Sequence, residues 1–250
     1  MKRIQKAKFG PAPARAVPLL AFGAHPDDIE FGCGAVIASE TAAGRAAHLV
    51  VCSKGKAASH GTTAERIKEA EASAKILGAT LEFVDLGGDC HIERSCIHAI
   101  TLAAIIRTRR PRIILAPTPV PNQHPDHARL GDLVRDATRL ARYGGLDELK
   151  ATPPHAIEQL LFYAVTFDAE PKDMQPILFD VSNPKTIDIW TSAMEAHFSQ
   201  SRTRDYVQLQ LMRAKLNGLR AGVGHAMALF PNDPLIVNSF SRITGAARRF

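Results

Sequence analysis

Two short segments of the chain hold most of the side chains that could carry out metal-dependent chemistry. Residues 24–30 read Ala-His-Pro-Asp-Asp-Ile-Glu, and residues 122–127 read Asn-Gln-His-Pro-Asp-His. A catalytic zinc ion takes three protein ligands, commonly histidine and carboxylate groups, and leaves one position for water. The two segments together hold more such groups than one ion needs, which leaves some of them for acid–base work.

The first segment can supply two metal ligands and a base. His25 and Asp28 are three positions apart where a predicted strand ends, so both side chains can point at one ion. Asp27 would remain beside the metal. A carboxylate there can take a proton from a metal-bound water, whose pKa the ion lowers toward ~7.

The second segment can complete the site. One of its two histidines would be the third ligand. The other, hydrogen-bonded to Asp126, could stabilise an oxyanion or protonate an amine leaving group. A single His-Pro-Asp sequence also suits a turn, because proline fixes φ and aspartate caps the next helix. Two of them after two strands are harder to explain by capping alone, so we predict a shared metal site.

Alternating apolar and amphipathic stretches must position these segments. Continuous apolar runs predict strands at residues 18–22, 48–52, 81–86, 112–116, 159–165 and 177–181. Amphipathic spacing predicts helices at residues 34–43, 63–77, 95–109, 128–143, 186–198 and 203–219. This alternation indicates an α/β fold with a mostly parallel sheet and an appended C-terminal part. Parallel sheets bind ligands at the carboxyl ends of their strands, where both segments lie.

The basic charge lies mainly at the two ends of the chain. The sequence has 31 basic and 25 acidic residues and a net charge of +6. Residues 1–16 carry five basic and no acidic side chains, and residues 241–250 carry three basic ones. We predict a flexible basic arm at 1–16, one domain at 17–240 and a basic tail at 241–250. The near-neutral body argues against nucleic-acid binding.

Cysteine spacing and hydropathy indicate in which cellular compartment the protein works. The four cysteines form no CxxC pair, and the spacing of Cys90, His91, Cys96 and His98 fits no structural zinc pattern. No apolar run approaches the ~20 residues that cross a bilayer. The N-terminal residues lack the apolar stretch of a signal peptide. We expect a cytoplasmic protein with reduced thiols and no membrane partner.

The two segments resemble the signatures of a known family. AHPDDIEFGCG (24–34) and QHPDH (123–127) are similar to the paired motifs of the LmbE-like, or PIG-L, family of zinc-dependent N-deacetylases. The resemblance spans residues 19–140 and includes GTTAER at 61–66. It is strongest to the bacterial bacillithiol-pathway branch, which acts on N-acetylglucosaminides. It implies a Rossmann-like three-layer sandwich, a cytoplasmic hydrolase of an acetamido sugar, and a homo-oligomer that is a trimer or hexamer.

The resemblance implies a ligand set and a base. His25, Asp28 and His127 match the three metal ligands, and Asp27 matches the general base. The implied ion is Zn²⁺, although Fe²⁺ or another divalent metal would also suit histidine and carboxylate ligands.

The resemblance also implies roles for residues around the substrate. His124 matches the histidine that polarises the carbonyl or protonates the amine, and Asp126 matches the carboxylate that orients this histidine. Arg66 and Asp89 match positions that contact the sugar in relatives.

Departures from the family pattern concern the substrate. Lys56 follows Gly55 where relatives often have glutamate, and Gln123 stands where the bacillithiol branch often has arginine. Both changes argue against an acidic malate aglycone. His225 lies where relatives often carry an aromatic residue, and we expect it to pack rather than to reach the pocket.

Other functions would fit the same residues. A related metal-dependent amidase could cleave a thiol conjugate or a non-sugar acetamide with this site. A non-catalytic binding module with a structural metal is disfavoured, because structural zinc sites prefer four protein ligands and sulfur.

Overall fold

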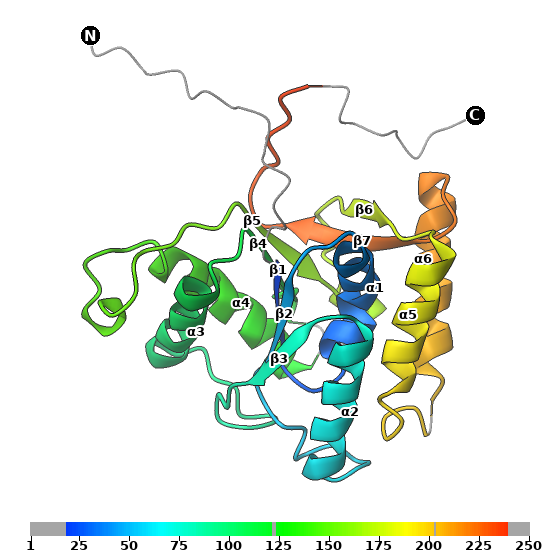
Figure 1. Cartoon of the computed structure of the whole chain (residues 1–250), viewed down its shortest axis with the longest axis horizontal. Helices are drawn as coiled ribbons and strands as arrows, with labels where there is room; N and C mark the ends of the chain where they lie inside the picture. The colour runs from blue at the N-terminus through cyan, green and yellow to red at the C-terminus, as the bar shows by residue number, and fades with distance from the viewer. Residues whose placement is uncertain (1–18, 122–123, 203, 240–250) are drawn as a thin grey trace.

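A seven-stranded sheet forms the centre of the protein. The computed structural model describes residues 19–121, 124–202 and 204–239, and its strands follow the order β3-β2-β1-β4-β5-β7-β6 (Figure 1). The strands are β1 Leu19–Gly23, β2 Ala47–Val51, β3 Thr80–Phe83, β4 Ile113–Pro117, β5 Gln159–Tyr163, β6 Ile177–Asp180 and β7 Ala226–Pro231. The first five strands in this order run parallel, whereas β7 runs antiparallel to both β5 and β6.

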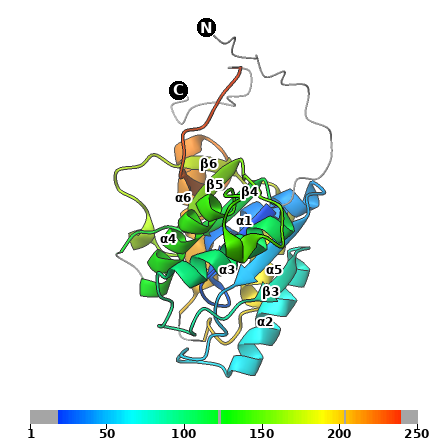
Figure 2. The same ribbon diagram turned by 90° about the vertical axis from the view of Figure 1, so that its left-hand side faces the viewer.

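Helices cover both faces of the sheet (Figures 1 and 2). One face carries α3 Cys96–Arg109 and α4 Pro125–Leu140. The other carries α1 Asp28–Ala42, α2 Thr63–Ile76, α5 Pro184–Glu195 and α6 Tyr206–Ala221. Successive residues of each central strand enter opposite buried clusters, which is why these strands have continuous apolar sequences. Two short 3-10 helices, η1 Asp147–Leu149 and η2 Phe167–Ala169, lie in the connections on either side of β5.

The predicted α/β fold with a mostly parallel sheet is confirmed, and the C-terminal part adds β6 and β7 to the same sheet. The basic arm at 1–16 and the tail at 241–250 lie outside the described residues. In the part of the chain that the structure describes, no helix is both long and apolar enough to span a membrane.

Two helices begin earlier than predicted, and one strand was not predicted. Helix α1 begins at Asp28 rather than at residue 34, because residues 28–38 are all buried and so lack amphipathic spacing. Helix α4 begins at Pro125 rather than at residue 128, since proline suits a first helical turn. Strand β7 was not predicted. It is a short apolar run that follows the glycine-containing residues 222–224.

The pairing of β1 with β4 brings the two His-Pro-Asp segments together. These strands are adjacent and parallel, with Leu19 opposite Ile113. The segment after β1 leads into α1, and the segment after β4 leads into α4. Both helix starts therefore lie at the same edge of the sheet.

Candidate active site

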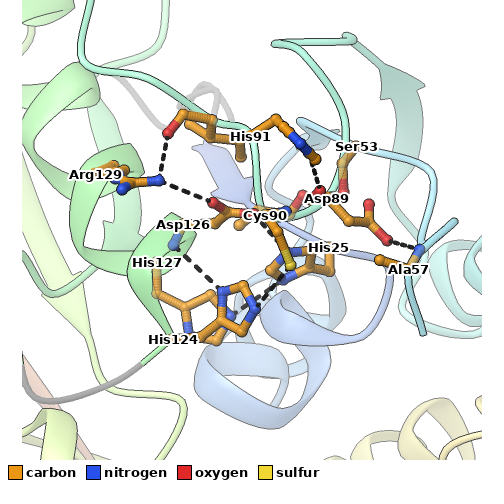
Figure 3. A network of polar contacts seen from close by, with 12 residues as sticks. His25, Ser53, Ala57, Asp89, Cys90, His91, His124, Asp126, His127 and Arg129 are labelled. Carbon is orange, nitrogen blue, oxygen red and sulfur yellow. Dashed lines mark hydrogen bonds and ion pairs between the residues drawn. The ribbon is translucent and has the colours of Figure 1, made fainter. Parts of the chain in front are cut away.

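Three histidine rings meet at this edge of the sheet (Figure 3). His25 lies between β1 and α1, His124 is the N-cap of α4, and His127 lies in the first turn of α4. One ring nitrogen from each lies within 4.8 Å of the other two. His25 Nδ1 lies 3.3 Å from His127 Nε2. This group could hold a metal ion.

The carboxylate of Asp28 lies beside two of these histidine rings. Its Oδ1 lies 2.9 Å from His127 Nε2, and its Oδ2 lies 3.5 Å from His25 Nδ1. Ligand atoms at the corners of a zinc tetrahedron with bonds of ~2.0–2.1 Å lie about 3.3 Å apart. The donors of His25, Asp28 and His127 lie close to this spacing and could hold one ion, whereas for the overlapping set in which His124 replaces Asp28 the donors lie within 4.8 Å of one another.

The chain fixes the orientation and charge of Asp28. The backbone N–H groups of Ala24 and His25 both donate to its Oδ2 at 2.9 Å. Although burial opposes ionisation, the charges of His127 and His25 hold the pKa of Asp28 well below its ordinary value. Against burial, Asp28 and Asp126 raise the pKa of His25 to about 10. A metal cation would take the place of the proton that this cluster otherwise attracts.

Asp27 lies beside this cluster and contributes to neither donor set. Its backbone has a φ of 111°, in the left-handed region that non-glycine residues rarely adopt. Arg66 donates from Nη2 to Asp27 Oδ2 at 3.1 Å and also to the carbonyl of Pro26. Burial raises the pKa of Asp27 to about 6, while the charge of Arg66 opposes this shift. A carboxylate with this pKa suits a proton acceptor near neutral pH.

The carboxylate of Asp126 contacts His25 rather than the ring of His124. Its Oδ2 lies 3.1 Å from His25 Nε2 and accepts the Cys90 N–H at 2.6 Å, while Arg129 lies 3.8 Å from its Oδ1 (Figure 3). Burial opposes ionisation, but the His25 hydrogen bond lowers the pKa of Asp126. A carboxylate on the outer nitrogen of a histidine fixes the direction in which the inner nitrogen points.

His124 is the most exposed of the three histidines. Its Nδ1 accepts the backbone N–H of Asp126 at 3.3 Å, so Nε2 points away from α4. Burial, together with the charges of His25 and His127, lowers the pKa of His124. This shift favours the neutral ring, and because Nδ1 accepts the Asp126 N–H, its Nε2–H can donate a hydrogen bond.

Arg66 and Asp89 both line a cavity of about 240 Å³ over the histidines, but Arg66 Nη2 and both Asp89 carboxylate oxygens already bond to the chain. The Asp89 carboxylate accepts the N–H groups of Gly55 at 3.0 Å and Ala57 at 2.8 Å. Gly55 has a φ of 70°, and a Cβ at this position would lie 2.7 Å from Arg66. Asp89 and Arg66 thus hold the loop after β2 against the site.

Sequence reasoning missed two residues near the histidines. The exposed Cys90 places its Sγ 3.8 Å from His124 Nε2, although its spacing from other ligand-type residues predicted no metal role. Gln200, after α5, also lines the cavity. No sequence signal links these residues to the two motifs. His225 hydrogen-bonds through its backbone to Ser182 and lines none of the cavities described here.

Of the two residues that depart from the family pattern, the structure describes only Lys56. Lys56 is exposed and is not among the residues that line the cavity. Gln123 lies outside the described residues.

Comparisons with known proteins agree with the motif resemblance. Residues 20–138 match the family model described as PIG-L, GlcNAc-PI de-N-acetylase. The conserved protein TT1542 from Thermus thermophilus has 29% identity and a TM-score of 0.77, over 90% of this chain and 99% of that chain. The N,N'-diacetylchitobiose deacetylase from Pyrococcus horikoshii has 22% identity and a TM-score of 0.75, over 86% and 83% of the two chains.

A third similar structure has a different activity. GalB, the 4-carboxy-2-hydroxymuconate hydratase from Pseudomonas putida, has 20% identity and a TM-score of 0.76, over 90% of this chain and 99% of that chain. The fold alone therefore does not determine the reaction. The family match rests on the segment that contains both His-Pro-Asp motifs, and residues 20–138 of this chain form a PIG-L, or LmbE-like, family domain.

Proposed function

We propose that this protein is a metal-dependent hydrolase that removes the acetyl group from an N-acetylglucosamine-type substrate. The observation that carries the proposal is the convergence of three metal-type donors beside a carboxylate that is not needed as a ligand. The family match and the similarity to a chitobiose deacetylase support the same reaction class.

His25, Asp28 and His127 would hold the ion, with Zn²⁺ as the first candidate and Fe²⁺ as another. When bound, such an ion polarises an amide carbonyl and lowers the pKa of a water molecule. Asp126 would position His25 through the Nε2 contact at 3.1 Å.

Asp27 would accept the proton of the attacking water. Arg66 holds its carboxylate at 3.1 Å and keeps it oriented toward the cavity. His124 lines the same cavity with a neutral ring. As a neutral ring it would donate a hydrogen bond to the oxyanion, and the proton that Asp27 takes from the water would be passed to the departing amine, either directly or through His124 as an imidazolium.

A related amidase acting on a thiol conjugate or a non-sugar acetamide is the second candidate. It is favoured by the chain contacts of Arg66 and Asp89, because these leave fewer free groups for sugar hydroxyls. Homo-oligomerisation into a trimer or hexamer also remains a prediction, and light scattering of the purified protein would test it.

Amine release from a panel of N-acetylglucosamine derivatives and simple acetamides tests the proposal. We expect release that a chelator abolishes and added Zn²⁺ restores. The Asp27→Asn variant should bind metal and release almost no amine. If the metal-loaded wild type hydrolyses no amide in the panel, the proposed function is wrong.

A further inference from the structure

A second and larger cavity opens next to the metal-site cavity. It has a volume of about 440 Å³ and shares Asp27, His124 and Gln200 with the smaller cavity. Two of these shared residues are the proposed base and the proposed oxyanion or amine partner. Whatever occupies the larger cavity therefore lies directly beside the reacting amide.

Aromatic and aliphatic side chains form one part of the lining of this cavity, beside the polar side chains of Thr166, Asp168, Arg204 and Gln210. Phe31 of α1, Phe167 of η2, and Tyr206 and Leu209 of α6 all line it. The rings of Phe31 and Tyr206 lie 6.0 Å apart at an angle of 56°. Phe167 is 47% exposed, so about half of its surface is open to a ligand in the cavity. Flat apolar groups bind well between such walls.

Arg213 fixes the wall that carries Phe167. This arginine is only 7% exposed. It donates to the carbonyl of Ala164 at 2.8 Å and to Glu170 at 3.0 Å. Its guanidinium carbon lies 5.0 Å from the centre of the Phe167 ring. The connection after β5 is thus tied to α6 on both sides of Phe167, so the cavity is formed before any ligand arrives.

The size of the cavity exceeds what an acetyl group needs. An apolar cavity of about 150 Å³ already holds a benzene molecule, and sites for whole small-molecule ligands begin at about 300 Å³. A volume of about 440 Å³ leaves room for a ring or an acyl chain beyond the amide.

We infer that this cavity binds a flat, apolar group, such as an aryl ring or an extended acyl chain, that the substrate carries next to its amide. The inference rests on the proposed function for the position of the amide. The group could be attached on the amine side or on the acyl side, and the chemistry of the walls is the same for both.

A substrate panel with two arms tests the inference. The first arm compares the methyl and phenyl β-glycosides of N-acetylglucosamine, which places the ring on the amine side. The second compares N-acetyl with N-phenylacetyl glucosamine, which places it on the acyl side. In one arm, we expect kcat/KM for the aromatic member to be about tenfold higher than for its partner.

Phe167→Ala and Phe198→Ala form a matched pair of variants. Both phenylalanines are exposed, and each lies near an arginine guanidinium, at 5.0 Å for Phe167 and 5.3 Å for Phe198. Only Phe167 lines the larger cavity, whereas Phe198 lines a separate groove beside α6. Phe167→Ala should lower kcat/KM for the aromatic substrate about tenfold more than for the small one, which removes the preference. Phe198→Ala should keep the preference.

Equal rates for both members of each arm would overturn the inference. So would a Phe167→Ala variant that slows the small and the aromatic substrate by the same factor. Calorimetric binding of the phenyl glycoside separates this outcome from failure of the proposed function. Binding that depends on Phe167, without hydrolysis of any amide, would support the cavity and refute the deacetylase assignment. Absence of both binding and hydrolysis would refute both.

Discussion

Replacing Asp27 by asparagine should stabilise the metal-free protein. Burial raises the pKa of this carboxyl from 3.8 to about 6, against the opposing charge of Arg66. A difference of about two pKa units lowers the folding stability at neutral pH by about 3 kcal/mol. Asparagine has the same shape, carries no charge and can still accept the hydrogen bond from Arg66. The free energy of unfolding should therefore rise by up to about 3 kcal/mol.

The pH dependence of this difference has a definite sign. The folded protein binds the Asp27 proton more tightly than the unfolded chain does, so this carboxyl lowers stability as pH rises from about 4 to about 6. Below that window the carboxyl is neutral in both states, and the variant gains little. Above it, the full gain is present. Urea unfolding of chelator-treated wild type and Asp27→Asn across this pH window measures the difference directly.

The same variant should lose activity while it keeps its metal. Asp27 lies outside both donor sets, and general-base catalysis contributes about 10²–10⁴-fold to a rate. Asp188→Asn, at an exposed acid on α5, is the control and should change neither property. A stability difference that stays constant across the pH window, or an Asp27→Asn variant with near wild-type activity, would refute the reasoning.

Three further predictions concern the metal ligands, the Cys90 thiol and the buried Arg107. Elemental analysis should show that His127→Ala has lost the metal. His124→Ala should keep the metal if Asp28 is the third ligand. Loss of the metal in both variants would favour the three-histidine set. Iodoacetamide should inactivate the wild type and the Cys96→Ser variant but not Cys90→Ser, because only the Cys90 thiol lies 3.8 Å from His124. Arg107→Met should lower the free energy of unfolding by about 3 kcal/mol or more, because Arg107 is buried and donates to four backbone carbonyls. An unchanged urea midpoint for that last variant would contradict this.

The sheet could be predicted from the sequence because its central strands are apolar on both faces. Each strand run predicted before β6 matches a strand of the structure to within a few residues. The start of α1 could not be predicted, since residues 28–38 are buried on every side and carry no periodic signal. Strand β7 was missed for a related reason, because its antiparallel place between β5 and β6 depends on tertiary contacts.

Some features of the site could also be predicted from the sequence, and others could not. The two motifs follow the adjacent strands β1 and β4, so the meeting of their histidines could be expected from strand order. The contact of Asp126 with His25 could not be predicted, because it depends on which ring the buried carboxylate faces once α4 has packed. The position of Cys90 depends on a left-handed backbone, with a φ of 67° in a loop that contains no regular structure.

Different parts of the chain supply the metal donors and the walls of the larger cavity. Every metal-type donor, and the proposed base, lies within the family segment at residues 20–138. Most of the apolar and polar wall of the larger cavity comes from residues 165–168 and 200–210, outside that segment. Substitutions in the C-terminal walls can therefore change which group is bound without disturbing the metal donors. The similarity of this fold to both a deacetylase and a hydratase fits that division, since a shared scaffold can carry different sites. In this chain, substrate preference should therefore follow Phe167 and its neighbours, while hydrolysis should follow Asp27.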